Sequence, residues 1–289
     1  MDSFRHRQVT LDSADLHVVE AGDPAAAPVL FLHGWPQCWL SWRAVMTHAA
    51  ADVRAIAVDL PGVGGSTGAP PDGTKRALAQ VVHRLAGELD LSGVTLVGHD
   101  VGGMIAYAYL RAYPDLARAV IMDVVIPGLE PWARVVANPY IWHFAFHAVE
   151  NLPETLVAGH EREYFDHFYD VLAADPATIT DEARSAHAAA YASRAALTAG
   201  FSWYRAFPRD AEENAATVGP LATPLLYLRG EHERGDMEPY LTGFRAAGLT
   251  DVTHARVPGA GHFAPEESPA QTWQAIAGFL SRWCPGAGH

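Results

Sequence analysis

Short apolar runs alternate with longer segments of helical spacing along the first part of the chain. The runs occupy 29–32, 53–58, 94–97 and 119–122, and each is almost continuously apolar. A continuous run, rather than an alternating one, is typical of a strand buried on both faces of a parallel sheet. Each intervening segment is long enough for a crossover helix. The pattern therefore predicts a parallel sheet with helices on both faces.

The alternation is interrupted once and then resumes. Segments 9–11 and 16–19 predict an antiparallel hairpin at the edge of the sheet, and 225–228 and 252–257 predict two further strands. From 128 to 216 the chain has helical spacing, many aromatic residues and no strand pattern, with Pro-Gly and Gly-Pro turns near its two ends. We expect an α/β fold with a mostly parallel eight-stranded sheet. The predicted core domain is 1–127 and 217–289, and the predicted inserted helical cap is 128–216.

Composition narrows the classes of protein that fit this pattern. The chain has 289 residues, 49% of them hydrophobic, so it can bury a large core. Its formal net charge of −13 disfavours nucleic acid and anionic membranes as partners, because both rely on basic surface. Cys38 and Cys284 are too few for a disulfide framework or a cysteine-ligated metal. No apolar run approaches the ~20 residues that span a bilayer, and the first residues lack a secretory signal pattern. We therefore expect a cytoplasmic protein with no metal.

The most informative motif is Gly98-His99-Asp100-Val101-Gly102, directly after the run 94–97. In a nucleophile elbow, Gly-x-Ser-x-Gly turns sharply from a strand into a helix and exposes the serine oxygen above the sheet. Here Asp100 stands in the place of that serine. A carboxylate is ionised near neutral pH and can attack an electrophilic carbon without a base to activate it. Asp100 is therefore the candidate nucleophile, and the alternative is an acid that only caps the helix.

A second motif, His33-Gly34-Trp35-Pro36, follows the run 29–32 and predicts a tight turn at the same edge of the sheet. Such a turn can aim a backbone N–H into the crevice above the elbow. The N–H groups of Trp35 and Val101 are the candidates for an oxyanion hole. We expect His33 to stabilise the turn rather than to take part in catalysis.

A histidine and several acids follow later strands at this edge. His262 lies in a glycine-containing loop after the last predicted strand, which makes it the candidate general base. Its partner acid has two candidate places. Asp123 ends the strand after the elbow helix, and Glu233 follows the run 225–228 with Glu231 and Asp236 nearby. Either place can hold the acid that orients the histidine.

These three motifs, in this order, resemble the α/β-hydrolase fold. Gly-His-Asp-x-Gly-Gly with His-Gly-Trp-Pro resembles its epoxide hydrolase and dehalogenase branch, and the segment 59–66 resembles its loop after the fourth strand. Cap segments around Trp142, Tyr164 and Tyr204 are similar to those of bacterial epoxide hydrolases of the cystic fibrosis transmembrane regulator inhibitory factor type. The resemblance extends over nearly the whole chain. It implies a hydrolase that needs no cofactor.

In that subgroup a cap histidine and a cap tyrosine hold the epoxide oxygen. Local motifs assign these roles to His167 and Tyr204, and the subgroup's relay acid falls on Asp123, where the family residue is usually glutamate. Glu233 stays the alternative acid. If two tyrosines act instead, Tyr164 or Tyr140 is the second. Three other histidines compete with His167: His143, His147 and His160. The expected substrate pocket includes Trp142, His143 and Phe263.

The resemblance implies that Asp100 opens an epoxide to form an ester, which water activated by His262 hydrolyses to a vicinal diol. A dehalogenase would form the same ester by displacing halide. However, Val101 stands where haloalkane enzymes commonly have tryptophan, and the elbow helix lacks the arginines of fluoroacetate enzymes. A serine esterase is disfavoured because the elbow has no serine. A third alternative is a non-catalytic member of the fold that binds a small apolar ligand. The expected partners are an epoxide and water, with a homodimer as one candidate assembly.

Overall fold

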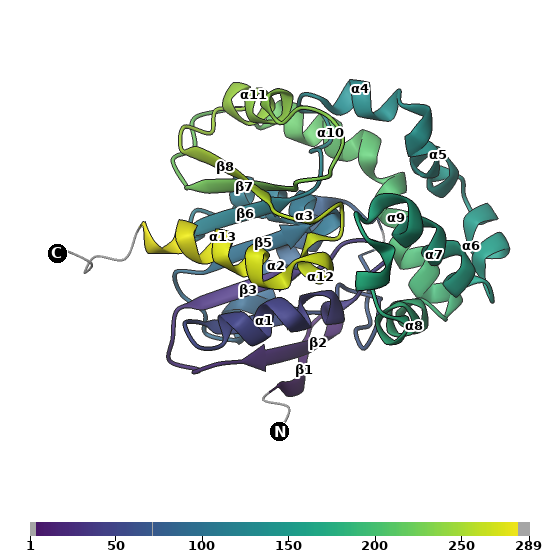
Figure 1. Ribbon diagram of the computed structural model, residues 1–289, viewed down its shortest axis with the longest axis horizontal. Coiled ribbons are helices and arrows are strands. Elements are labelled where there is room, and N and C mark those ends of the chain that lie inside the picture. The colour runs from purple at the N-terminus through teal and green to yellow at the C-terminus, as the bar shows by residue number, and fades with distance from the viewer. Residues whose placement is uncertain (1–3, 71, 283–289) are drawn as a thin grey trace.

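Eight strands form one sheet in the order β1-β2-β4-β3-β5-β6-β7-β8 in the computed structural model, which describes residues 4–70 and 72–282 (Figure 1). The predicted position Cys284 lies outside these residues. β1 and β2 form an antiparallel hairpin, β2 pairs antiparallel with β4, and all other neighbours are parallel. The strands are β1 (Arg5–Leu11), β2 (Ala14–Ala21), β3 (Pro28–Leu32), β4 (Arg54–Val58), β5 (Thr95–His99), β6 (Arg118–Met122), β7 (Leu225–Gly230) and β8 (Val252–Val257). The predicted fold class is confirmed.

The central strands are buried because their side chains are apolar on both faces. Every residue of β5 is buried, and β3, β4 and β6 each leave only their first residue partly exposed. β3 and β5 pair in register from Val29 opposite Thr95 to Leu32 opposite Gly98. Their carboxyl ends therefore meet at one edge, and the loops that follow them lie side by side there.

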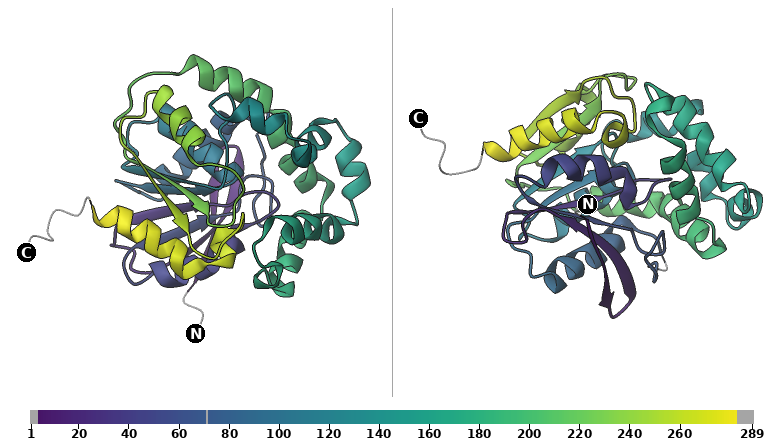
Figure 2. Two further views of the ribbon diagram at one scale, coloured as in Figure 1. Left: turned by 45° about the horizontal axis from the view of Figure 1, so that its top comes forward. Right: turned by 60° about the horizontal axis from the view of Figure 1, so that its bottom comes forward.

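Helices cover both faces of the sheet, as the two views in Figure 2 show. On one face, α1 (Arg43–Ala49) and α13 (Pro269–Ser281) pack with Phe31 and Val120 in one apolar cluster. On the other face, α2 (Lys75–Glu88), α3 (Val101–Ala112) and α11 (Glu238–Ala246) pack with Leu30 and Leu96. The short helices η1 (Trp39–Trp42) and α12 (Ala264–Glu267) flank α1.

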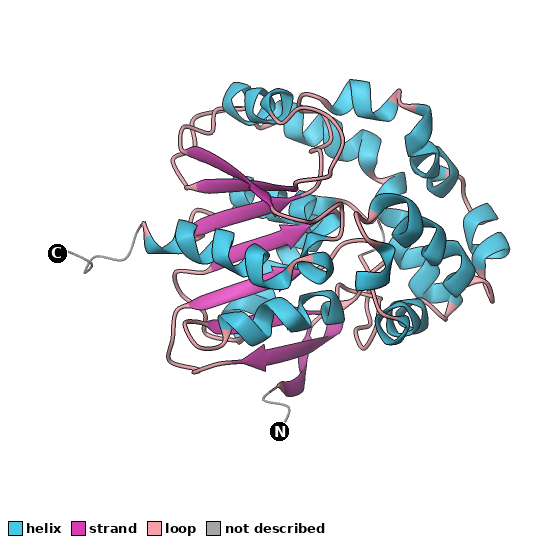
Figure 3. Cartoon of the chain, viewed as in Figure 1, coloured by secondary structure: helices cyan, strands magenta, loops and turns pink. Residues whose placement is uncertain are grey.

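Between β6 and β7 the described chain contains only helices and loops, which lie beyond the carboxyl ends of the parallel strands (Figure 3). These helices are α4 (Trp132–Val136), η2 (Pro139–Ile141), α5 (Trp142–Ala148), α6 (Leu152–Val157), α7 (Glu161–Leu172), η3 (Pro176–Thr178), α8 (Asp181–Ala190), α9 (Arg194–Arg205) and α10 (Phe207–Ala216). All of them fall within the range predicted for the cap. None of the helices in the described residues is long and apolar enough to cross a membrane.

Candidate active site

Asp100 lies on a strained turn between β5 and α3. Its φ of 50° and ψ of −123° fall in a region that side chains other than glycine rarely adopt. Small neighbours make the turn feasible: a Cβ on Gly98 would lie 2.1 Å from the Gly102 carbonyl oxygen, and one on Gly102 would lie 2.3 Å from the Leu32 carbonyl oxygen. A Cβ on Gly34 would lie 2.5 Å from Cβ of Asp100 itself. Gly98 is thus required by the tightness of the elbow itself, and Gly34 and Gly102 by the close approach of the two loops.

The carboxylate of Asp100 faces the predicted oxyanion hole. The Trp35 N–H donates to Oδ1 of Asp100 at 2.9 Å. Burial raises the pKa of Asp100 above its ordinary value, while His262 and the N–H groups of Trp35 and Val101 oppose that rise by stabilising the carboxylate. Oδ1 is therefore held by the backbone, and Oδ2 is the oxygen that faces His262.

His262 lies between Asp100 and an acid from the loop after β7. Its Nε2 is 4.0 Å from Oδ2 of Asp100, and its Nδ1 is 2.8 Å from Oε1 of Glu233. Arg229 donates to the other oxygen of Glu233 at 2.8 Å. Burial alone would lower the pKa of His262, but the hydrogen bond and charge of Glu233, with Asp100 and Asp123, raise it to about 9. The ring is thus oriented by Glu233 and charged when Asp100 is ionised.

The hydrogen bond of the histidine corrects our first choice of partner acid. Asp123 has a φ of 49°, and its Oδ1 accepts the Gly230 N–H at 2.7 Å, which turns the carboxyl toward β7. Its Oδ2 has no hydrogen-bond partner among the described residues. Burial and the neighbouring charge of Glu233 raise the pKa of Asp123 well above its ordinary value. Asp123 is one methylene shorter than glutamate and already tied to Gly230, so Glu233, the alternative acid, contacts His262.

Two cap side chains, Tyr204 and His143, lie over this centre. Tyr204 is buried on α9, and its ring centroid is 5.7 Å from that of Trp35 and 5.9 Å from that of His143 on α5. Burial and the charge of Asp100 raise the pKa of Tyr204 well above its ordinary value, so its hydroxyl stays protonated. Burial, with the charge of His262, lowers the pKa of His143 to about 3, so the ring is neutral. Both groups are therefore in neutral forms that can donate a hydrogen bond.

The position of His167 contradicts its expected role. Its side chain is exposed on α7, whereas the adjacent Phe168 is buried. Consecutive residues on a helix point about 100° apart, so the face of α7 that buries Phe168 turns His167 away. Tyr140, an alternative donor, is 78% exposed. Tyr164, the other alternative, hydrogen-bonds through its hydroxyl to Nε2 of His147 at 2.7 Å.

The remaining predicted residues occupy distinct places. Trp142 is 44% exposed, and its ring packs beside those of Phe168 and His167 at centroid distances of 5.9 and 6.0 Å. Phe263 is buried beside His262, with ring centroids 5.0 Å apart, and packs on the cap residue Tyr169. His33 accepts the Leu60 N–H at Nε2, at 2.9 Å, and its Nδ1 lies 2.8 Å from the Gly34 carbonyl oxygen. The turn-stabilising role expected for His33 agrees with these contacts.

The sequence analysis missed His99, and it expected His143 in the substrate pocket rather than as the donor beside Tyr204. Nε2 of His99 lies 2.7 Å from the carbonyl oxygen of His262 and supports that loop from below. His143 and His147 are four residues apart and both buried, with ring centroids 5.6 Å apart. Residues four apart lie on one face of a helix, so the spacing of His143 and His147 in the sequence could have indicated that both rings point inward together.

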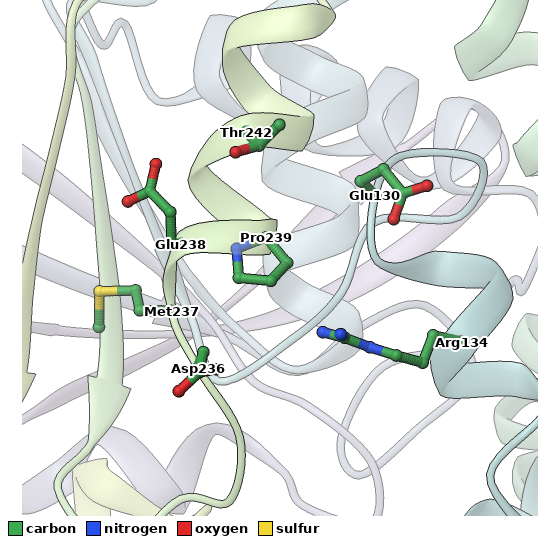
Figure 4. A pocket seen from close by; sticks show the side chains of 7 residues that line it. All are labelled: Glu130, Arg134, Asp236, Met237, Glu238, Pro239 and Thr242. Atoms are coloured by element: carbon green, nitrogen blue, oxygen red, sulfur yellow. The ribbon is translucent and has the colours of Figure 1, made fainter.

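A surface hollow lies apart from these residues. It is lined by Glu130 and Arg134 on one side and by the segment 236–239 and Thr242 on the other (Figure 4). Of the candidate acids only Asp236 lines it, and Asp100, His262 and Glu233 do not. Within residues 4–70 and 72–282, no group of three or more His, Cys, Asp or Glu side chains could hold a metal ion.

Comparison with known proteins places this geometry in a family. Residues 27–269 match the family model described as the alpha/beta hydrolase fold. The chain is 29% identical over 271 residues to the soluble epoxide hydrolase of Corynebacterium sp. (strain C12), covering 91% of this chain and 93% of the relative. It is 27% identical to epoxide hydrolase A of Mycobacterium tuberculosis, covering 97% and 98% of the two chains. The crystal structure of Cfl2 from Burkholderia cenocepacia superposes with a TM-score of 0.87 at 33% identity, covering 96% of both chains. The chain therefore belongs to the alpha/beta hydrolase fold family.

Proposed function

We propose that the protein hydrolyses an epoxide to a vicinal diol through an alkyl ester on Asp100. One observation carries this proposal: Oδ1 of Asp100 is held by the Trp35 N–H at 2.9 Å, while Oδ2 lies 4.0 Å from Nε2 of His262. The charge of Asp100 also raises the pKa of the cap residue Tyr204. A carboxylate held in this way is a nucleophile rather than a cap, because its free oxygen points into the site. The similarity to proteins named epoxide hydrolases supports an epoxide as the substrate class.

In the first step, Oδ2 of Asp100 attacks one carbon of the epoxide and the C–O bond to the ring oxygen breaks. Tyr204 and His143 hydrogen-bond that oxygen, and the Tyr204 hydroxyl supplies a proton as negative charge develops on it. Both groups are suited to this task because burial keeps them in their neutral, donating forms. The product of the step is a hydroxyalkyl ester of Asp100.

Formation of the ester also prepares His262. In the free site, the carboxylate of Asp100 is one of the charges that raise the pKa of His262 to about 9. Esterification removes that charge, so the pKa of the imidazolium falls, and the ring passes its proton through solvent to the Tyr204 oxygen that lost a proton in the first step. The histidine then becomes a base only after the ester exists. Glu233 keeps the ring oriented throughout, because its hydrogen bond is to Nδ1.

In the second step, neutral His262 takes a proton from a water that attacks the ester carbonyl carbon. The oxyanion forms on Oδ1, where the N–H groups of Trp35 and Val101 stabilise it. A single donor of this kind contributes about 3 kcal/mol in comparable sites. Collapse of the intermediate breaks the bond between the carbonyl carbon and Oδ2, and the departing oxygen takes the proton from His262 to complete the diol. The proton left on the new carboxyl group then passes to His262, which restores the carboxylate of Asp100 and the imidazolium.

Trapping the ester tests this scheme. His262→Gln removes the base of the second step. Incubation of this variant with a reactive epoxide should therefore add the mass of one substrate to the protein, and peptide mass spectrometry should locate the added mass on Asp100. Asp100→Ala should form no adduct and no diol. A panel of epoxides and haloacids, with diol and halide measured together, separates epoxide hydrolysis from dehalogenation. Loss of the adduct in His262→Gln, or turnover by Asp100→Ala, would exclude the mechanism.

We also propose a domain division, a cellular location and an assembly state for the protein. The division into a core of 1–127 and 217–289 and a cap of 128–216 follows the predicted change in pattern. A cytoplasmic location fits the scarcity of cysteine. Assembly as a homodimer is checked by light scattering after size-exclusion chromatography, where a mass near 31.1 kDa would exclude it.

A further inference from the structure

We infer that Glu267 is a positioning residue that ties the orientation of His262 to the seating of the cap. Glu267 is the last residue of α12 and follows His262 by five positions. Its carboxylate contacts the loop of the general base and the cap at the same time. The inference rests on the proposed function, because it concerns the step in which His262 acts as a base.

The carboxylate binds the backbone on both sides of the general base. Oε2 of Glu267 accepts the Gly261 N–H at 3.0 Å, and Oε1 accepts the Phe263 N–H at 2.8 Å. These two residues flank His262 directly. The imidazole ring is attached to the backbone between these two N–H groups. Hydrogen bonds to both N–H groups therefore hold the backbone of His262, and with it the position of the Cα–Cβ bond from which the ring extends.

The same oxygen reaches the cap. Oε2 of Glu267 also accepts the Ala174 N–H at 2.6 Å, just beyond the end of α7. The His262 N–H donates to the Leu172 carbonyl oxygen at 3.0 Å. Three successive N–H groups, of residues 261, 262 and 263, therefore end on Glu267 or on the cap.

The loop that carries His262 packs directly against the cap segment 172–174. A Cβ added to Gly261 would lie 2.5 Å from the Ala174 nitrogen and 2.6 Å from the Leu172 carbonyl oxygen. The two backbones thus meet directly, without side chains between them. Any displacement of the segment 172–174 displaces the loop of His262, and Glu267 is the charged group that joins them.

The chemistry makes this coupling selective for one step. Ester formation uses Asp100, Tyr204 and His143, none of which contacts Glu267. Ester hydrolysis needs Nε2 of His262 to reach a water at the ester carbonyl, and a misplacement of about 1 Å can reduce such a step by about a hundredfold. Loss of the Glu267 contacts should therefore slow hydrolysis of the ester and leave its formation nearly unchanged.

Single-turnover measurements on the full-length protein test the inference with Glu267→Gln. The glutamine side chain has one oxygen and one NH₂ group in place of the two carboxylate oxygens. Its NH₂ group cannot accept a hydrogen bond from a backbone N–H, so at least one of the three contacts of Glu267 is lost. By rapid quench and intact mass, we expect ester formation to stay within about twofold of wild type and ester decay to slow by at least about tenfold. At steady state, most of the enzyme should then carry the ester.

Two further variants keep the test decisive. Glu231→Gln is the matched control, because Oε2 of Glu231 accepts the Gly259 N–H at 3.0 Å in the same loop but contacts neither His262 nor the cap. Ala174→Pro removes the cap N–H and puts a ring carbon against Oε2 of Glu267, so it separates Glu267 from the cap. The preceding Ala173, at φ −71° and ψ 149°, has the conformation that proline requires of its predecessor. The Ala174→Pro variant should also slow ester decay, and it carries the test if Glu267→Gln does not fold.

Ester decay at the rate of the Glu231→Gln control would overturn the inference. A parallel fall of formation and decay would do the same, because it would show a general structural role. Failure of the proposed function looks different, since His262→Gln would then form no ester at all.

Discussion

Nδ1 of His262 lies 2.8 Å from Oε1 of Glu233, whereas Asp123, which follows the neighbouring strand, accepts a hydrogen bond from the Gly230 N–H at its Oδ1. Both carboxyls are buried and both act on the charge of the histidine. They differ in their contacts. Glu233 hydrogen-bonds to the ring of His262 and orients it, whereas Asp123 hydrogen-bonds to Gly230. Burial and the charge of Glu233 raise the pKa of Asp123. The site thus holds two acids of unequal function.

Replacement of each acid should separate them. Glu233→Gln removes the charge that supports the imidazolium and weakens the orientation of the ring, so kcat should fall by at least about a hundredfold. The pKa of His262 should fall as well, which shifts the acidic limb of the pH–rate profile to lower pH. Asp123→Asn, with the same loss of a carboxyl, should reduce kcat far less. The reverse order of the two losses, measured by steady-state kinetics, would assign the relay to Asp123.

The oxygen donors are tested by three conservative changes in the cap. Tyr204→Phe and His143→Gln each remove a group beside the attacked oxygen, and each should lower kcat/KM by about a hundredfold through slower ester formation. His167→Gln is the control, because the side chain is exposed, and its kcat/KM should stay within about twofold of wild type. A large loss in His167→Gln would instead restore the assignment made from local motifs.

A glycine of the elbow should be irreplaceable for steric reasons. In Gly102→Ala, the new Cβ would lie 2.3 Å from the Leu32 carbonyl oxygen, a backbone atom of a buried residue that cannot move aside as a flexible side chain would. The free energy of unfolding should fall by about 3 kcal/mol. Gly278→Ala on α13 has open space around the added methyl and should raise that free energy by about 0.5 kcal/mol. Urea denaturation of the two variants gives both values.

The charge of His262 makes stability depend on pH in a defined window. Its pKa is raised from 6.5 to about 9 in the folded protein, despite burial, by Glu233 and Asp100. A raised pKa stabilises the fold fully below pH 6.5, and this contribution is lost as the pH rises through 9. The difference in unfolding free energy between wild type and His262→Gln should therefore shrink from pH 6 to pH 10. A difference that stays constant over this range would show that the histidine is not charged in the fold.

The fold and the elbow could be predicted because their signals are local. Continuous apolar runs identified the parallel strands, and the glycines around Asp100 and Trp35 identified the turns that the backbone must make there. The histidine of the cap could not be chosen in the same way. Whether His143 or His167 faces inward depends on how each helix is rotated against its neighbours, and both stand in similar aromatic surroundings.

The relay acid was uncertain for a different reason. Asp123 and Glu233 follow adjacent strands, so their sequence positions are equally suitable. The outcome depends on the length of the Asp123 side chain, which the sequence gives, and on the path of the loop that carries Glu233, which the sequence does not reveal. The contacts of Glu267 are to backbone N–H groups, which every residue except proline offers, so no residue type could reveal them.

The two oxygens of Asp100 have different fates because only Oδ1 is bound by the Trp35 N–H. In the proposed cycle Oδ2 departs with each diol, and an atom from water takes its place, whereas Oδ1 stays on the protein. In water enriched with oxygen-18, the first diol released by each molecule should therefore be unlabelled, and the second should be almost fully labelled. Rotation of the carboxylate between cycles would scramble the isotope, so the labelling pattern of successive products measures how firmly one backbone N–H holds one atom.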